Sequence, residues 1–169
     1  PLKTLFRIYI NSVGGNACLN LNIPPNRDGL LDERDVKRLK ELRALLDQEL
    51  GHPLEAKAEK KPGGYPTQPE YLITLEKPVA RVKYVELTED IAKGQRVENF
   101  RIEAMFPDGN QFPLFQGTTI GNRKICQLTD PFVEQNRLLD DSGDKIDRLL
   151  VKVPAARDEV FLKSIRIFS

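Results

Sequence analysis

The chain has 169 residues and a formal net charge of +1, with 30% charged and 40% hydrophobic residues. This length fits one ordinary domain or two small ones, and the composition is that of a globular protein. The near-zero charge gives no electrostatic basis for binding nucleic acid or an anionic membrane surface. No apolar run approaches the roughly 20 residues of a membrane-spanning helix. We therefore expect no nucleic-acid partner and no membrane insertion.

Histidine and cysteine are scarce, which narrows the possible chemistry. His52 is the single histidine and lies in a turn-like Gly-His-Pro context, which argues against a His-based zinc site or a Ser-His-Asp triad. Cys18 and Cys126 lack metal-binding spacing, so two buried free thiols are favoured over a disulfide. Neither a metal nor a cofactor is expected. Glu89 and Asp90 are adjacent carboxylates, but a solvated surface is their favoured interpretation.

Residues 1–51 carry helical periodicity at both ends. Apolar side chains over 2–13 fall on one face of a helix. A second helix is predicted over 33–50, with Asp32 as its N-cap.

Between these helices, residues 17–23 alternate apolar and polar side chains, as a short strand does. Pro24 and Pro25 end it, because proline cannot continue a hydrogen-bonded ladder. One strand and two helices cannot make a sheet, so this region is predicted to be a helix–strand–helix piece of a larger α/β fold.

The period of the apolar residues changes to two in the second half of the chain. Residues 52–70 hold four prolines and two glycines and are predicted to be a linker. Short strands at regular spacing over 71–169 predict an antiparallel β-sandwich, with 134–147 as a charged insertion loop. The expected strands are 71–76, 80–88, 97–106, 112–116, 123–128, 148–153 and 160–168.

Three stretches resemble one enzyme family. Residues 11–30 read NSVGGNACLNLNIPPNRDGL and resemble the SVGRNxNLLLNIPPDxxGxI motif near the end of the catalytic barrel of α-L-fucosidases. Residues 87–104 read LTEDIAKGQRVENFRIEA and resemble the LxEDIxxGQRVxxFxxEA run of the C-terminal β-sandwich in that family. Residues 117–125, GTTIGNRKI, resemble the GTTIGxKRI stretch that follows.

The resemblance implies the C-terminal part of an α-L-fucosidase. Residues 1–51 would be the end of a (β/α)8-like barrel (helix, strand eight, helix), and 71–169 a sandwich of the galactose-binding-like type. The family hydrolyses terminal α-L-fucosides with retention, using an aspartate nucleophile and a carboxylic acid/base. By the family pattern both precede strand eight, so they would lie upstream of Pro1 and this chain alone would be inactive. Fucosidases of this kind are commonly exported, which implies a secreted or periplasmic parent.

The resemblance also nominates site residues, although none is catalytic and none binds metal. Asn22, Pro24 and Pro25 would lie at the C-terminal end of strand eight and line the rim of the fucose pocket. Arg96 and Arg123, in two polar loops, would make charge-assisted contacts between sandwich and barrel. The expected partners are the rest of the barrel and a fucosylated glycan substrate.

Three positions depart from the family motif. Gly15 replaces the usual Arg, Cys18 the usual Asn and Asn20 the usual Leu. Altered specificity and weak activity both stay open. The alternative function is a non-catalytic carbohydrate-binding or structural β-sandwich module, for which bracing is favoured over sugar binding because the chain has no Trp. If residues 1–50 packed onto the sandwich and closed on themselves, that alternative would be favoured. An exposed apolar face, as from Leu5, Phe6, Leu39, Leu42 and Leu46, would favour the enzyme piece.

Overall fold

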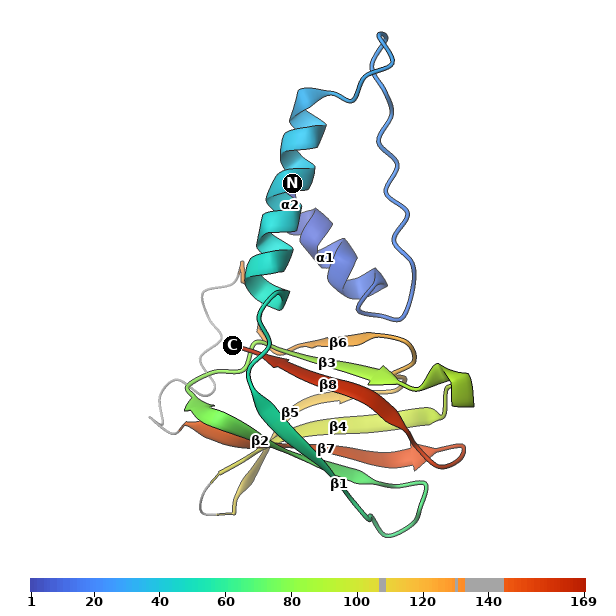
Figure 1. Ribbon diagram of the computed structural model, residues 1–169, viewed down its shortest axis with the longest axis vertical. Helices are drawn as coiled ribbons and strands as arrows, with labels where there is room; N and C mark the ends of the chain where they lie inside the picture. Colours follow the sequence, from blue (N-terminus) through green and yellow to red (C-terminus); the bar gives the residue numbers. More distant parts are fainter. Residues whose placement is uncertain (107–108, 130, 133–144) are drawn as a thin grey trace.

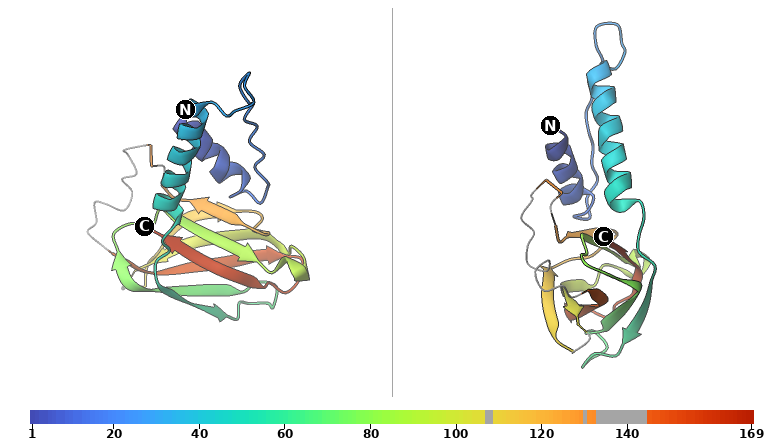
Figure 2. Two further views of the ribbon diagram at one scale, coloured as in Figure 1. Left: turned by 45° about the horizontal axis from the view of Figure 1, so that its top comes forward. Right: turned by 90° about the vertical axis from the view of Figure 1, so that its left-hand side faces the viewer.

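The computed structural model describes residues 1–106, 109–129, 131–132 and 145–169. Two helices, α1 (Leu2–Ser12) and α2 (Glu33–Leu50), stand on one side of a two-layered β-sandwich (Figures 1 and 2). Among the described residues, no helix is both long and apolar enough to cross a membrane.

The sandwich consists of two antiparallel sheets. The larger has the order β1-β2-β7-β4-β5 and the smaller the order β6-β3-β8. A short 3-10 helix, η1, follows β3. The bounds are β1 Ala56–Lys61, β2 Glu70–Val79, β3 Tyr84–Glu89, η1 Ile91–Lys93, β4 Val97–Met105, β5 Gln111–Gly117, β6 Lys124–Gln127, β7 Ile146–Ala156 and β8 Leu162–Phe168.

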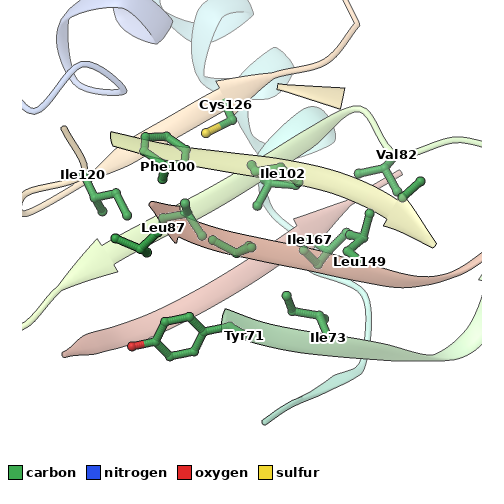
Figure 3. Packing of buried hydrophobic residues seen from close by; sticks show 14 of the residues in the cluster. Tyr71, Ile73, Val82, Leu87, Phe100, Ile102, Ile120, Cys126, Leu149 and Ile167 are labelled. Atoms are coloured by element: carbon green, nitrogen blue, oxygen red, sulfur yellow. The ribbon is translucent and has the colours of Figure 1, made fainter. Parts of the chain in front are cut away.

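The main core fills the space between the sheets. Leu87 and Ile167 of the smaller sheet meet Phe100, Ile102 and Leu149 of the larger sheet, and all five are buried (Figure 3). Because successive side chains of a strand point to opposite faces, period-two alternation produces this core. The predicted mostly antiparallel β architecture is therefore confirmed.

The strands follow the predicted pattern with two differences. The segment 52–70, predicted as a linker, contains β1, the exposed edge strand of the larger sheet, which the sequence did not predict. Every residue of β1 is exposed, so it has no apolar alternation that could reveal it. The predicted insertion loop over 134–147 lies mostly outside the described residues, and its last two positions begin β7.

The strand predicted over 17–23 does not form, and this prediction is wrong for the chain as it stands. Residues 17–24 run without regular secondary structure. The physical reason is that a strand needs the backbone hydrogen bonds of a neighbouring strand, and in Figure 1 this segment rises beside the helices, away from both sheets.

Both helices form as predicted. Asp32 caps α2, and its Oδ1 accepts the backbone N–H of Arg34 at 2.9 Å. The side-chain and backbone hydrogen bonds from Arg34 lower the pKa of Asp32 to about 2.

A second hydrophobic cluster joins the helices to the outer face of the smaller sheet. Phe6 of α1 and Leu42 of α2 are buried with Tyr84, Ile125 and Phe168 of the sheet. The Phe6 and Tyr84 rings meet edge to face at 6.4 Å. The expectation that Phe6 and Leu42 would be exposed is wrong, because the smaller sheet and the paired helices cover them.

Candidate functional site

The predicted rim residues lie on a long arm formed by residues 16–31 between α1 and α2. Asn22, Pro24 and Pro25 are all exposed there. The arm reaches away from both sheets (Figures 1 and 2). A rim needs a pocket wall opposite these residues, so their role in fucose binding stays a prediction.

The tip of the arm is a hydrogen-bonded turn. The side-chain oxygen of Asn26 accepts the backbone N–H groups of Asp28 at 3.0 Å and Leu30 at 2.9 Å. Gly29 has φ +77°, a left-handed conformation that glycine adopts without strain. The tip is therefore a formed turn although it packs against neither sheet.

Apolar side chains are left exposed on the arm and on α1. They are Ile8, Leu21, Leu30 and Leu31. Three of them, Leu21, Leu30 and Leu31, lie on the projecting arm, and exposed apolar side chains on such an element are typical of a surface that another part of a protein covers. This observation favours a larger parent in which the arm is buried.

Arg123 joins the sandwich to α1. Its guanidinium donates to Glu86 Oε2 at 2.8 Å and to the hydroxyl of Tyr9 on α1 at 3.0 Å. Glu86 is buried, and its Oε1 accepts from Arg166 at 2.9 Å. Burial would lower the pKa of Arg123, but the bonds to Glu86 and Tyr9 raise it overall. Arg123 is thus a fixed cation between the helical segment and the smaller sheet.

Arg96 lies elsewhere, at the end of the sandwich beside η1. Its guanidinium donates to the backbone carbonyls of Lys93 at 2.9 Å and Glu159 at 2.8 Å. It also lies over the ring of Phe161, 5.6 Å from the centroid. These contacts bind loops of the sandwich to one another, and a contact of Arg96 with a barrel stays a prediction.

The loop before β6 touches the start of the arm. The backbone N–H of Asn122 donates to the side chain of Asn16 at 2.7 Å, and that of Ile125 donates to the Gly14 carbonyl at 2.8 Å. Gly121 has φ +65°, a conformation that other residues rarely adopt, and a Cβ there would also displace the Asn16 side chain, which would lie 2.2 Å away. Two of the family-like stretches, 11–30 and 117–125, therefore meet in space.

Glu89 is a buried carboxylate, so its predicted place on a solvated surface is wrong. Glu89 is only 2% exposed. Oε1 accepts the backbone N–H groups of Arg96 at 2.9 Å and Val97 at 3.1 Å, and Oε2 accepts that of Gly121 at 2.7 Å. One carboxylate thereby fixes the start of β4 and the loop before β6 to the end of β3.

The other buried carboxylates are also engaged in contacts within the fold. Glu103 Oε2 lies 2.7 Å from the ammonium of Lys152, and Glu86 lies between two arginines. Glu49 of α2 lies 3.8 Å from the ammonium of Lys83. Across the described ranges, no three metal-ligating side chains gather into a group that could hold a metal ion.

Sequence comparison matches most of the chain to one class of enzyme. No protein-family model matches it. It is 28% identical to α-L-fucosidase 1 of Arabidopsis thaliana, with 76% of this chain and 31% of that protein covered. It is 30% identical to a protein of Oryza sativa subsp. japonica provisionally named α-L-fucosidase 1, with 87% of this chain and 33% of that protein covered.

Structure comparison points to the same class of enzyme as the sequence comparison. A crystal structure from Bacteroides ovatus ATCC 8483, provisionally assigned as an α-L-fucosidase, matches with a TM-score of 0.78 and 32% identity over 99% of this chain and 26% of that one. The chain is a relative of the α-L-fucosidases and matches their C-terminal part. It spans about a third of the length of the curated relatives.

The three departures from the α-L-fucosidase motif are all exposed. Gly15, just before the arm, forms an isolated β-bridge with Lys124 of the smaller sheet. Asn20 and Cys18 lie on the irregular segment of the arm. An exposed Asn20 amide can bond to water, so in this chain the substitution leaves no buried polar group unpaired.

The two thiols of this fucosidase relative are expected to differ in reactivity. Cys18 is exposed and Cys126 is buried, so the prediction that both are buried is wrong for Cys18. Burial raises the pKa of the Cys126 thiol to about 12, whereas the thiolate is the reactive form. We expect one thiol per chain to react with an aromatic disulfide reagent at pH 8 in the folded protein, and both after unfolding. Rapid reaction of a folded Cys18→Ser variant would contradict this.

Proposed function

We propose that the chain is the C-terminal portion of a retaining α-L-fucosidase whose catalytic carboxylates lie upstream of Pro1. The observation that carries the proposal is the match of most of this chain to α-L-fucosidases, of which it spans about a third. A glycosidase of this kind needs two carboxyl groups about 5 Å apart at the scissile bond. The buried carboxylates described here instead hold arginines, lysines and backbone N–H groups. This chain alone is expected to be inactive.

In the proposed parent, residues 1–51 complete a (β/α)8-like barrel. Residues 17–23 would become strand eight by pairing with strands from the upstream part, which would also cover the exposed apolar side chains of the arm. Asn22, Pro24 and Pro25 would then stand at the C-terminal end of that strand, where such barrels bind substrate. The unpaired state of 17–24 and the exposure of Leu21 and Leu30 support this assignment.

The sandwich over 71–169, proposed to be of the galactose-binding-like type, would brace the barrel. Arg123 supports this role because it already connects Glu86 of the smaller sheet to Tyr9 of α1. The linker over 52–70 adds strand β1 to the larger sheet. The fucosylated glycan would bind to the barrel, with the sandwich acting on catalysis through the position of α1.

The alternative is a non-catalytic carbohydrate-binding or structural module. One observation favours it, which is that α1 and α2 pack onto the sandwich through the Phe6 cluster. The exposed arm opposes it, because an independent module gains nothing from an unpaired, partly apolar projection.

Hydrolysis of an aryl α-L-fucoside separates these functions. We expect no turnover by the 169-residue chain, and turnover with retained anomeric configuration by the chain joined to its upstream sequence. An intact mass measured on each sample identifies the species present. Turnover by the chain as the only species would place the catalytic carboxylates within it, and an inactive parent that still binds glycans would favour the alternative.

A further inference from the structure

A hollow of about 440 Å³ lies at the end of the sandwich beneath the β1–β2 connection. Its wall includes Gly63, Tyr65 and Pro69 from that connection, Lys60 from β1 and Glu159 from the β7–β8 connection. An adjoining hollow of about 360 Å³ shares Lys60 and continues between β1 and β8 past Phe161. Together they form one open surface of mixed polarity.

Tyr65 is exposed on a loop whose backbone is conformationally restricted. Its residue is 68% exposed, although an exposed ring contributes little to the fold. The backbone N–H of Gln68 donates to the Tyr65 carbonyl at 2.9 Å, which closes a turn. A Cβ on Gly63 would lie 1.6 Å from the Gln68 carbonyl oxygen, so the two sides of the loop cross in close contact. Prolines at 62, 66 and 69 further limit the backbone.

Hydrogen bonds to backbone carbonyls anchor the two polar residues beside Tyr65. The Lys60 ammonium donates to the Val160 carbonyl at 3.1 Å and lies 3.5 Å from Glu159 Oε1. The Glu159 carbonyl in turn accepts from the Arg96 guanidinium at 2.8 Å. Since an ammonium has three donors and a carboxylate two acceptor oxygens, Lys60 and Glu159 retain hydrogen-bonding capacity toward the hollow.

We propose that this hollow binds a neutral oligosaccharide, with a sugar ring stacked on Tyr65 and its hydroxyls bonded to Lys60 and Glu159. A sugar has an apolar face of C–H groups and a rim of hydroxyls that both donate and accept, which matches an aromatic ring beside an ammonium and a carboxylate. Lys60 and Glu159 carry opposite charges, so together they give no net charge that would favour a charged ligand. A preformed loop lowers the conformational entropy lost on binding. The choice of a fucosylated probe rests on the proposed function.

The test is a titration of the isotope-labelled 169-residue chain with fucosyllactose, followed by amide chemical shifts. We expect shifts confined to residues 60–69 and 158–161, with a dissociation constant on the order of 1 mM for so small a contact. Tyr65→Ala should weaken binding at least about tenfold through loss of the stacking surface. Tyr65→Phe should bind within about twofold of the wild type, because it keeps the ring.

Two controls make the result decisive. Phe112→Ala removes an exposed aromatic from β5, outside both hollows, and should not change binding. Lactose tests the fucose contribution, and equal binding of lactose would support the site without a preference for fucose. The proposal would be overturned if no chemical shifts changed at a ligand concentration 20-fold above the expected dissociation constant. It would also be overturned if the shift changes persisted in Tyr65→Ala. Failure of fucoside turnover by the parent would leave this binding result unchanged.

Discussion

Replacing Glu89 with alanine is expected to lower the free energy of unfolding of the sandwich by about 3–5 kcal/mol. The carboxylate accepts three backbone N–H groups, from Arg96, Val97 and Gly121. Alanine would leave these donors without their partner in a site largely closed to water, and would also open a cavity. Denaturant unfolding monitored by circular dichroism measures the loss as a lower midpoint at an unchanged slope.

Glu98→Ala is the matched control for this prediction. Glu98 is a glutamate within β4, but its side chain is 48% exposed and pairs with Arg157 at 2.9 Å on the surface. Exposed ion pairs contribute at most about 1 kcal/mol, so a change within about 0.5 kcal/mol is expected. If Glu89→Ala were no more destabilising than Glu98→Ala, the carboxylate would not be holding the loops together.

The sequence only partly indicates the place of Glu89. Val85 and Leu87 of β3 point into the main core, and alternation carried two residues further would point Glu89 the same way. The predicted strand ends at residue 88, however, and the pairing of β3 with β8 shifts register between Thr88 and Glu89, so the local pattern does not decide which side the carboxylate faces. Its three donors come from segments that only the tertiary structure brings together.

The sequence is informative wherever the pattern is local. The β4 alternation of Phe100, Ile102 and Ala104 predicts a strand with one buried face, and the structure has it. β1 has no apolar face and escapes such analysis, although it pairs along its whole length with β2. The segment 17–23 shows the opposite case, in which a strand-like pattern has no partner strand beside it.

Contacts between distant segments limit how much of the candidate site could be predicted from the sequence. Arg123 was expected to make a charge-assisted contact, but nothing in its own sequence context identifies Tyr9 or Glu86 as partners. Tyr65 is a similar case, since an isolated tyrosine in a proline-rich stretch gives no indication that Lys60 and Glu159 lie beside it. Apart from Lys60, which is five residues from Tyr65, these partners are separated by tens of residues in the chain, and only the tertiary fold brings them together.

Phe6→Ala is expected to detach the helical segment from the sandwich without unfolding the sandwich. Phe6 is fully buried, and its ring meets Tyr84 at 6.4 Å and Phe132 at 6.0 Å. Truncation of a buried phenylalanine costs about 3–5 kcal/mol. The cluster around Phe6 is separate from the main core, so the cost falls on the contact between helices and sheet.

Amide hydrogen exchange distinguishes local detachment from global unfolding. In Phe6→Ala, protection should fall in α1 and α2 and persist at core positions such as Val85 and Leu87. Ile8→Ala is the matched control, because Ile8 lies on the same helix but is 41% exposed. It should leave the exchange of both parts nearly unchanged. Helix propensity does not complicate the comparison, since both variants introduce alanine, the best helix former.

The outcome also tests the proposed boundary near residue 51. If only the helices lose protection, the sandwich is a separate stability unit and residues 1–51 depend on it, as expected of a barrel end that lacks the rest of its barrel. If protection falls equally in both parts, the two clusters form one cooperative unit, and the division into 1–51 and 71–169 is wrong. A self-contained module, the alternative function, would then be favoured, because its helices would belong to the same fold as its sheets.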